Sequence, residues 1–133
     1  MNLKRYLEIS KEVQRALRAN KPVVAFDSSS AICDMPHGMR LSYLQAREEA
    51  ARAAGAVPAT IAILNGVIYV GLSRAEAEHL CSTAHPQKLS RRDLPVALAT
   101  GGTGAVTSAT GMIAAMLSRI QQRRHRRCAH RQP

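Results

Sequence analysis

The feature that most constrains the fold is the Asn65-Gly66 pair, which lies between two runs rich in β-branched and apolar residues. These runs are Thr60-Ile61-Ala62-Ile63-Leu64 and Val67-Ile68-Tyr69-Val70. Asn and Gly both tolerate a positive φ, so Asn-Gly between two such runs is a strong signal for a short β-hairpin. We therefore predict an antiparallel hairpin, and a sheet that contains it cannot be purely parallel.

Helices are predicted on both sides of the hairpin. Ser10 can cap a helix that runs to about Ala19. Leu41 to Ala54 is rich in Ala and Glu, and Gly55 is expected to end this second helix. Ser73 and Glu76 form a capping box at the start of a third helix, which runs to about residue 82.

Shorter patterns assign the rest of the chain as follows: a buried strand over Val23–Phe26, a loop over Ser28–Gly38, a helix over Leu94–Ala99 behind a weaker Ser90/Asp93 box, a turn over Gly101–Gly104, and a buried helix over Thr107–Ile120. Helices and strands alternate along the chain. The sequence therefore predicts an α/β fold, a partial three-layer α/β/α arrangement with a mixed sheet.

Composition favours one globular domain. The chain has 133 residues, of which 46% are hydrophobic, enough to bury a core. No apolar run approaches the length of a membrane span, and no secretory signal is recognisable at the start. Three widely spaced cysteines, Cys33, Cys81 and Cys128, predict reduced thiols rather than a disulfide framework. We expect a cytoplasmic protein.

The formal net charge of +10 is unevenly distributed. Five arginines and no acidic residue lie in residues 121–133, and without them the charge of residues 1–120 is +5. Such a tail is typical of a nucleic-acid-binding arm, but it is also what a disordered, out-of-frame segment would look like. His125, Cys128 and His130 resemble metal ligands, although repulsion among the arginines argues against a folded site there.

Two segments could bind phosphate. Lys88, Arg91 and Arg92 supply cations, and a helix capped by Ser90 would add main-chain amides. The alternative is a solvated basic segment, with Arg91 or Arg92 paired to Asp93. Gly101–Gly104 could cradle a phosphate, but it lacks the Lys of a P-loop, so a tight turn that allows close packing is favoured.

Asp27 follows the strand Val23–Phe26, and open α/β sheets bind ligands at the carboxyl ends of their strands. It is a candidate general acid or base, or else an ordinary loop carboxylate. Cys33 and His37 could form a thiol–imidazole pair or ligate a metal, but no third ligand lies near them in the sequence.

Four blocks of the chain resemble the amino-terminal part of the pseudouridine-5'-phosphate glycosidase family: Lys21 to Ala25, Gly55 to Leu72, Lys88 to Pro95, and Gly104 to Met112. The resemblance extends from about Ser10 to Ile120. It implies an α/β/α homotrimer that cleaves the carbon–carbon bond between uracil and ribose 5-phosphate. It also implies a divalent metal, typically manganese, and a Schiff-base lysine. That lysine and the metal-binding Asp lie beyond the resemblance, so no cofactor is expected for this chain alone.

The resemblance also implies roles for particular residues. Asp27, within Phe26-Asp27-Ser28-Ser29, stands where the family has a proton-donating Glu in a Leu-Glu-Ser-Thr pattern. Lys88 matches a substrate-binding lysine, and Ser108 falls at a substrate-contacting position that is usually Val. The family's Ser-His-Gly-Met-Pro loop is replaced by Ile32-Cys33-Asp34-Met35-Pro36.

Three functions remain open on the sequence alone. The first is the amino-terminal part of such a glycosidase over residues 1–120, inactive by itself and followed by a disordered tail over residues 121–133. The second is a small basic nucleic-acid-binding protein that acts through this tail. The third is a sugar-phosphate-binding module that needs a partner chain. We expect folding alone to be marginal, because Met112, Met116 and Ile120 would be left uncovered.

Overall fold

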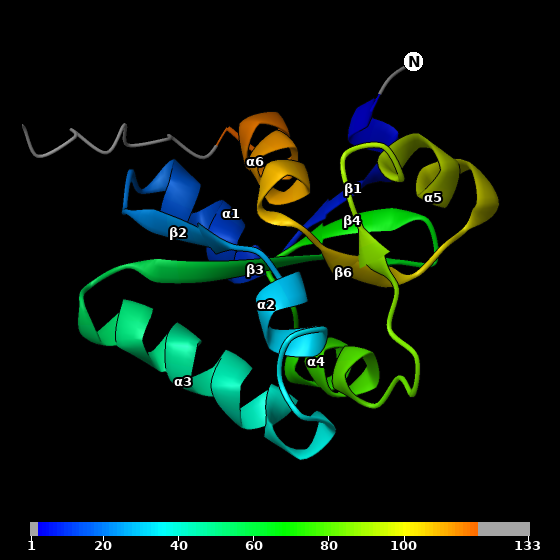
Figure 1. The fold of residues 1–133 in the computed structure, drawn as a ribbon. Coiled ribbons are helices and arrows are strands. Elements are labelled where there is room, and N and C mark those ends of the chain that lie inside the picture. The colour runs from blue at the N-terminus through cyan, green and yellow to red at the C-terminus, as the bar shows by residue number, and fades with distance from the viewer. Residues whose placement is uncertain (1–2, 120–133) are drawn as a thin grey trace, which may run out of the picture.

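A computed structural model describes residues 3–119 of the chain (Figure 1). In chain order the elements are 3-10 helix η1 (Leu3–Tyr6), β1 (Leu7–Ile9), α1 (Lys11–Arg18), β2 (Val23–Phe26), α2 (Ser29–Ile32), 3-10 helix η2 (His37–Met39), α3 (Arg40–Ala53), β3 (Val57–Leu64), β4 (Val67–Val70), α4 (Arg74–Cys81), β5 (Lys88–Leu89), α5 (Leu94–Thr100), β6 (Gly104–Val106) and α6 (Ser108–Leu117). None of the described helices has the length and apolar character that crossing a membrane requires. The arginine-rich tail lies outside the described residues. The predictions that concern it (disorder, a metal-ligand pattern and nucleic-acid binding) therefore stay predictions.

The six strands form one mixed sheet that is organised around β3. On one side, β3 pairs antiparallel with β4, and β1 lies parallel to the outer edge of β4. On its other side, β3 pairs with two strands in succession: β2 runs parallel along its first half, and β6 runs antiparallel along its second half. β5 lies parallel to β6. The predicted mixed α/β sheet is confirmed.

β2 and β6 run toward each other along the same edge of β3. The last residue of β2, Phe26, pairs with Thr60, and Ala105 of β6 pairs with Ala62, only two residues farther along β3. Since one strand is parallel to β3 and the other antiparallel, their carboxyl ends face each other. Residues that follow these two strands are therefore brought together in the middle of the sheet.

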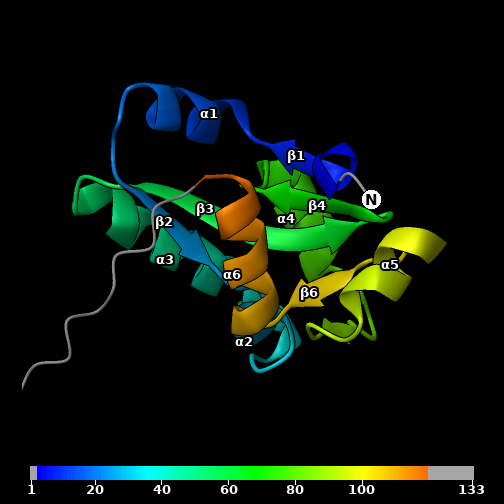
Figure 2. The ribbon, with the colours of Figure 1, turned by 90° about the horizontal axis from the view of Figure 1, so that it is seen from above.

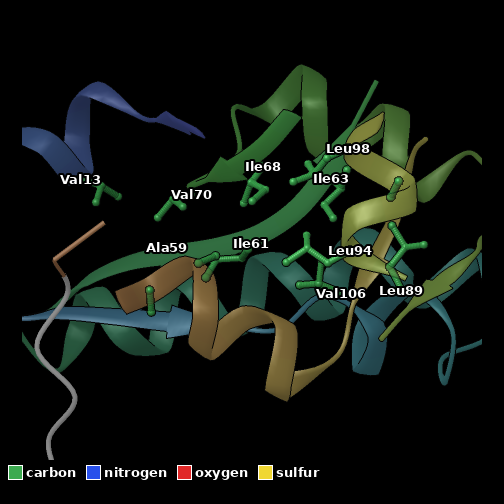
Figure 3. Packing of buried hydrophobic residues seen from close by; sticks show 13 residues of the cluster. Val13, Ala59, Ile61, Ile63, Ile68, Val70, Leu89, Leu94, Leu98 and Val106 are labelled. Carbon is green, nitrogen blue, oxygen red and sulfur yellow. The ribbon is translucent and has the colours of Figure 1, made fainter. Parts of the chain in front are cut away.

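Helices cover both faces of the sheet, as the predicted three-layer arrangement requires (Figures 1 and 2). On one face α1, α5 and α6 bury a cluster that includes the odd-numbered residues Ala59, Ile61 and Ile63 of β3, shown in Figure 3. On the other face α2, α3 and α4 pack against a cluster that includes Ala62 and Leu64 of the same strand. The alternation of side chains along β3 thus supplies both cores.

Local predictions from capping and turn residues are confirmed. The Ser10 hydroxyl accepts a hydrogen bond from the Val13 amide at 3.2 Å at the start of α1. Ser73 and Glu76 form both hydrogen bonds of the predicted capping box. In the hairpin turn Asn65 has φ 50° and Gly66 has φ 75°.

Several predictions are wrong in detail. The segment predicted as a loop over Ser28–Gly38 contains α2 and η2. The short strands β5 and β6 were not predicted, and β6 separates the glycine-rich turn from α6. The buried strand Val23–Phe26 is a sheet edge within the described residues, with Val24 exposed. The buried helix predicted over Thr107–Ile120 is α6, which exposes part of its apolar surface.

The predicted Ser90 cap is also wrong. α5 begins at Leu94, immediately after Asp93, and the Ser90 side chain instead donates to the Asp93 carboxylate at 2.7 Å. Ser90 therefore orders the turn that precedes the helix and is not its first residue. The amino terminus of α5 lies two residues after Arg92, and Pro95 in its first turn has no amide to donate.

Candidate functional site

The facing ends of β2 and β6 are joined through Ser28. The Ser28 amide donates to the Val106 carbonyl at 3.2 Å, and the Val106 amide donates to the Ser28 hydroxyl at 2.8 Å. Ser28 is fully buried. The main-chain amide of Val106 lies beyond the end of β2, so no strand carbonyl accepts its hydrogen bond, and the Ser28 hydroxyl accepts it instead. We call this meeting point of Ser28 and Val106 the strand-end junction.

Asp27 lies directly beside the strand-end junction, and its carboxylate is held by the residues that follow it. The hydroxyl groups of Ser29 and Ser30 donate to its two oxygens, each at 3.2 Å, and the Ser30 amide donates at 3.3 Å. These bonds tie the carboxylate to the first turn of α2, which is why the predicted loop is helical there. The carboxylate is only partly exposed, with 19% of the side chain accessible.

Arg47 of α3, which lies on the same face of the sheet as α2, fixes this segment. Its guanidinium donates to the Asp27 carbonyl at 2.6 Å and to the Ser30 hydroxyl at 3.2 Å, and it lies 3.6 Å from the Asp27 carboxylate. It also stacks on the Phe26 ring, 4.5 Å from the centroid. Burial lowers the pKa of Arg47, and the Asp27 carboxylate opposes that shift.

The other two candidate substrate-binding residues lie on neighbouring elements. Lys88 is exposed on β5 and pairs with Ala105 of β6, one residue before the strand-end junction. Ser108 is the exposed first residue of α6, two residues after Val106. Asp27, Lys88 and Ser108 therefore belong to three segments that converge on the facing ends of β2 and β6 (Figure 1).

Cys33 links the Asp27 segment to β5. Burial raises the pKa of the Cys33 thiol, while the Lys88 ammonium acts in the opposite direction and lowers it. An electrostatic effect of this kind requires that Lys88 and Cys33 lie within range of each other. Cys33 at the end of α2 and Lys88 on β5 are therefore close enough for the charge of Lys88 to act on the thiol.

The other predicted phosphate-binding features have different roles. Arg91 and Arg92 are exposed in the turn before α5, and hydrogen bonds from Ser90 lower the pKa of Asp93, with a smaller effect from Arg92. The glycine-rich segment packs tightly: a Cβ on Gly104 would lie 2.7 Å from the Gln87 carbonyl oxygen. The tight-turn interpretation holds for residues 101–103, whereas Gly104 is the first residue of β6, which leads on to α6.

The described residues do not form a metal site. Among residues 3–119, no three His, Cys, Asp or Glu side chains gather as metal ligands would. His37 is exposed in η2, and no metal-ligand group joins it to Cys33. The manganese implied by the resemblance does not fit the described part of the chain.

Two surface hollows, of about 630 and 510 Å³, lie elsewhere. The first is lined mainly by α1, β1, α3 and the segment after β4, and the second by α3 and α4. Neither contains Asp27, Lys88 or Ser108. The first hollow lies at the carboxyl ends of β1 and β4, whereas the three candidate residues converge on the carboxyl ends of β2 and β6, which makes the strand-end junction the candidate site.

Comparison with known proteins agrees with this architecture. The sequence profile of the family described as "Indigoidine synthase A like protein" matches residues 12–122. The chain belongs to this family. Its curated relatives include the pseudouridine-5'-phosphate glycosidases of Solibacter usitatus, 48% identical over 116 residues, and of Petrotoga mobilis, 45% identical over 121 residues. The resemblance found in the sequence is thereby confirmed.

The chain corresponds to only part of these indigoidine synthase A-like proteins. The matches cover 87% and 91% of this chain but 39% and 40% of the two relatives. Among solved structures, the prealnumycin C-glycosynthase AlnA in complex with ribulose 5-phosphate superposes with a TM-score of 0.76 and 41% identity, over 88% of this chain and 37% of that one. An indigoidine synthase A-like protein from Thermotoga maritima, 24% identical with a TM-score of 0.74, shares the fold over 86% of this chain and 37% of that one.

Sequence reasoning missed two residues that build the site. Arg47 is one of several charged residues on α3, and nothing local distinguishes it, because its partners lie 17 and 20 residues away. Ser28 looked like an ordinary loop serine, and its partner Val106 is 78 residues away. The serine run Ser28-Ser29-Ser30 after a strand and an Asp was the available signal for a carboxylate-binding turn.

Proposed function

We propose that this chain forms the substrate-facing, amino-terminal part of a pseudouridine-5'-phosphate glycosidase. The observation that carries the proposal is the position of Asp27 at the strand-end junction, anchored by Ser29, Ser30 and Arg47. The names of the curated relatives supply the reaction. In this proposal Asp27 transfers the proton, while Lys88 and Ser108 bind the substrate.

The proposed reaction cleaves the carbon–carbon bond between uracil and the sugar. Overall, water is consumed: uracil gains a hydrogen at the carbon that held the sugar, and ribose 5-phosphate gains the oxygen. A positioned acid is needed at the uracil carbon as the bond breaks. Among the described residues Asp27 places a carboxyl group at this junction, oriented by the hydrogen bonds from Ser29 and Ser30. It would give a proton to the uracil carbon and regain one from the water whose oxygen is added to the sugar.

Lys88 and Ser108 would act on the sugar phosphate. An exposed ammonium is a compact charge that suits a phosphate, and it needs no fixed orientation. Ser108 begins α6, where the hydroxyl and the free amides of the first turn can donate to an anionic ligand. The AlnA structure was determined in complex with ribulose 5-phosphate, which supports a sugar phosphate as the ligand class for this fold.

We further propose that this chain alone does not turn over substrate. It spans about two fifths of the length of the curated relatives that it matches, and catalytic groups that act together lose most of their effect when one is missing. In this proposal the remaining groups, including those for manganese, belong to the rest of a homotrimeric, cytoplasmic family enzyme.

Two measurements test the proposal. Purified chain with pseudouridine 5'-phosphate and added manganese should release no uracil, so turnover that disappears in Asp27→Ala would contradict the inactivity of the lone chain. Calorimetric titration with ribose 5-phosphate should show weak binding, with Kd above about 1 μM, that is lost in Lys88→Ala and retained in Lys21→Ala, an exposed lysine after α1. Binding that is equal in both variants would rule out Lys88 as the phosphate ligand.

A further inference from the structure

The outer face of α6 is apolar where a surface helix would be polar. Met112 and Met116 lie one turn apart and are 55% and 66% exposed. The helix Ser108–Leu117 carries no charged residue. A helix at a free surface usually presents polar groups opposite its buried stripe, and methionine is common where apolar surfaces adapt to a partner. This face of α6 has the composition of an interface.

The strand next to α6 is open on one side. Among residues 3–119, β2 pairs with β3 alone, so its second edge has no strand neighbour. β2 lies beside α6 in Figure 2, and the two elements are in contact. An open edge offers unpaired main-chain groups to another strand.

Apolar side chains also flank this edge on the opposite face. Val24 is 37% exposed, and it shares a face of β2 with Phe26, over which the Arg47 guanidinium of α3 lies. Tyr43, on the same helix as Arg47, is 39% exposed. The open edge of β2 therefore has uncovered apolar groups on both faces, which we call the α6–β2 surface: Val24, Tyr43, Met112 and Met116.

We propose that the α6–β2 surface binds a second polypeptide. Its sequence corresponds to the part of the family proteins that has no match in this chain. This partner would add a strand beside β2 and cover Met112 and Met116 with apolar side chains. The match ends at residue 122, just after α6, whereas about 60% of each curated relative lies outside the match. The proposal rests on the proposed function only through the family that both share.

A second copy of this chain is the alternative occupant. Pairing two copies through this surface would leave the unmatched part of the family without any counterpart. The matched sequence ends shortly after α6, and α6 itself forms part of the uncovered surface. This coincidence favours the family polypeptide over a self-contact.

The test is co-expression of the full 133-residue chain with the part of the Solibacter usitatus relative that lies outside its match to this chain. Size-exclusion chromatography with light scattering should show a complex of the two polypeptides. The double variant Met112→Lys/Met116→Lys should weaken the complex by at least tenfold. The matched control is Met39→Lys/Val96→Lys, which adds the same charge at residues 52% and 64% exposed on η2 and α5, and it should bind as the unmodified chain does.

Each outcome decides the proposal. Recovery of the chain without the partner, or equal binding by both double variants, overturns it, as does self-association of the chain that Met112→Lys/Met116→Lys abolishes. Circular dichroism of the variants separates a lost surface from a lost fold, and Met112→Gln/Met116→Gln repeats the test without added charge. Uracil release by the complex is read separately: a complex without turnover refutes the proposed activity and leaves the docking surface intact.

Discussion

Ser28 and Val106 exchange two hydrogen bonds, although they are 78 residues apart. Ser28 lies just after the end of β2, and Val106 is the last residue of β6. The Ser28 hydroxyl takes the amide that a neighbouring strand would otherwise bind, and its own amide returns a bond to the Val106 carbonyl. β2 and β6 can therefore meet end to end without an unsatisfied amide at Val106. Asp27 directly precedes Ser28, and Ser108 follows Val106 by two residues, so both candidate residues lie beside this bonded pair.

Ser28→Ala should destabilise the fold by about 1–3 kcal/mol, because it leaves the Val106 amide without its acceptor. Urea denaturation measures the free energy of unfolding, and hydrogen exchange at the Val106 amide should accelerate. Ser42→Ala is the control, since that hydroxyl is exposed on α3; it should change stability by less than about 0.5 kcal/mol. Equal effects of the two substitutions would show that the Ser28 hydroxyl contributes nothing particular.

Arg47→Lys should cost about 2 kcal/mol even though it keeps the charge. An ammonium cannot stack on Phe26 while also donating to the Asp27 carbonyl and the Ser30 hydroxyl. Arg52→Lys on the same helix is the matched control, because Arg52 is half exposed and pairs with Glu12 at the surface; it should cost less than about 1 kcal/mol. Urea denaturation of both variants gives the comparison. If Arg47→Lys leaves the free energy of unfolding unchanged, the positive charge alone is sufficient at this position.

The sequence predicted the features that depend on neighbouring residues. Asn65-Gly66 determines its own turn, and the Ser73/Glu76 box bonds within three residues. The two faces of β3 follow from simple alternation. The predicted run began at Thr60, whereas β3 begins at Val57 and includes Pro58. The strand tolerates this proline because the Val57 amide bonds toward β2, so the nitrogen of Pro58 points the other way, where pairing with β4 has ended.

The features that depend on distant partners were not predictable. β5 and β6 contain two and three residues, too few for any periodicity, and they exist because each pairs with a distant segment. α6 seemed buried because its composition is apolar, but composition does not tell which apolar face lacks a partner. For the site, the resemblance identified Asp27, Lys88 and Ser108 as candidates, whereas Arg47 and Ser28 became apparent only from their long-range contacts.

The thiol of Cys33 should report the presence of Lys88. Burial raises the pKa of both Cys33 and Cys81, so both should be alkylated slowly near neutral pH, where little thiolate is present. Lys88→Ala removes a charge that lowers the pKa of Cys33, so alkylation of Cys33 by iodoacetamide should slow by roughly two- to threefold. Mass spectrometry of separate peptides gives both rates, and Cys81 is the internal control. An unchanged Cys33 rate would place Lys88 away from the Asp27 segment.

Asp93 should make stability depend on pH through its bonds with Ser90. The Ser90 hydroxyl and amide donate to its carboxylate at 2.7 and 2.8 Å, and these bonds lower the pKa of Asp93, the hydroxyl having the larger effect. A carboxyl whose pKa is lower in the folded state stabilises the fold above its unfolded pKa, and this stabilisation is lost as the pH falls through the folded value.

Ser90→Ala should raise the pKa of Asp93 part of the way toward its ordinary value, because the amide still donates. A carbon-detected NMR titration of the Asp93 carboxyl measures this shift, with Ser82→Ala as the control for an exposed serine elsewhere. If the pKa of Asp93 is the same in Ser90→Ala and Ser82→Ala, the hydroxyl does not stabilise the carboxylate.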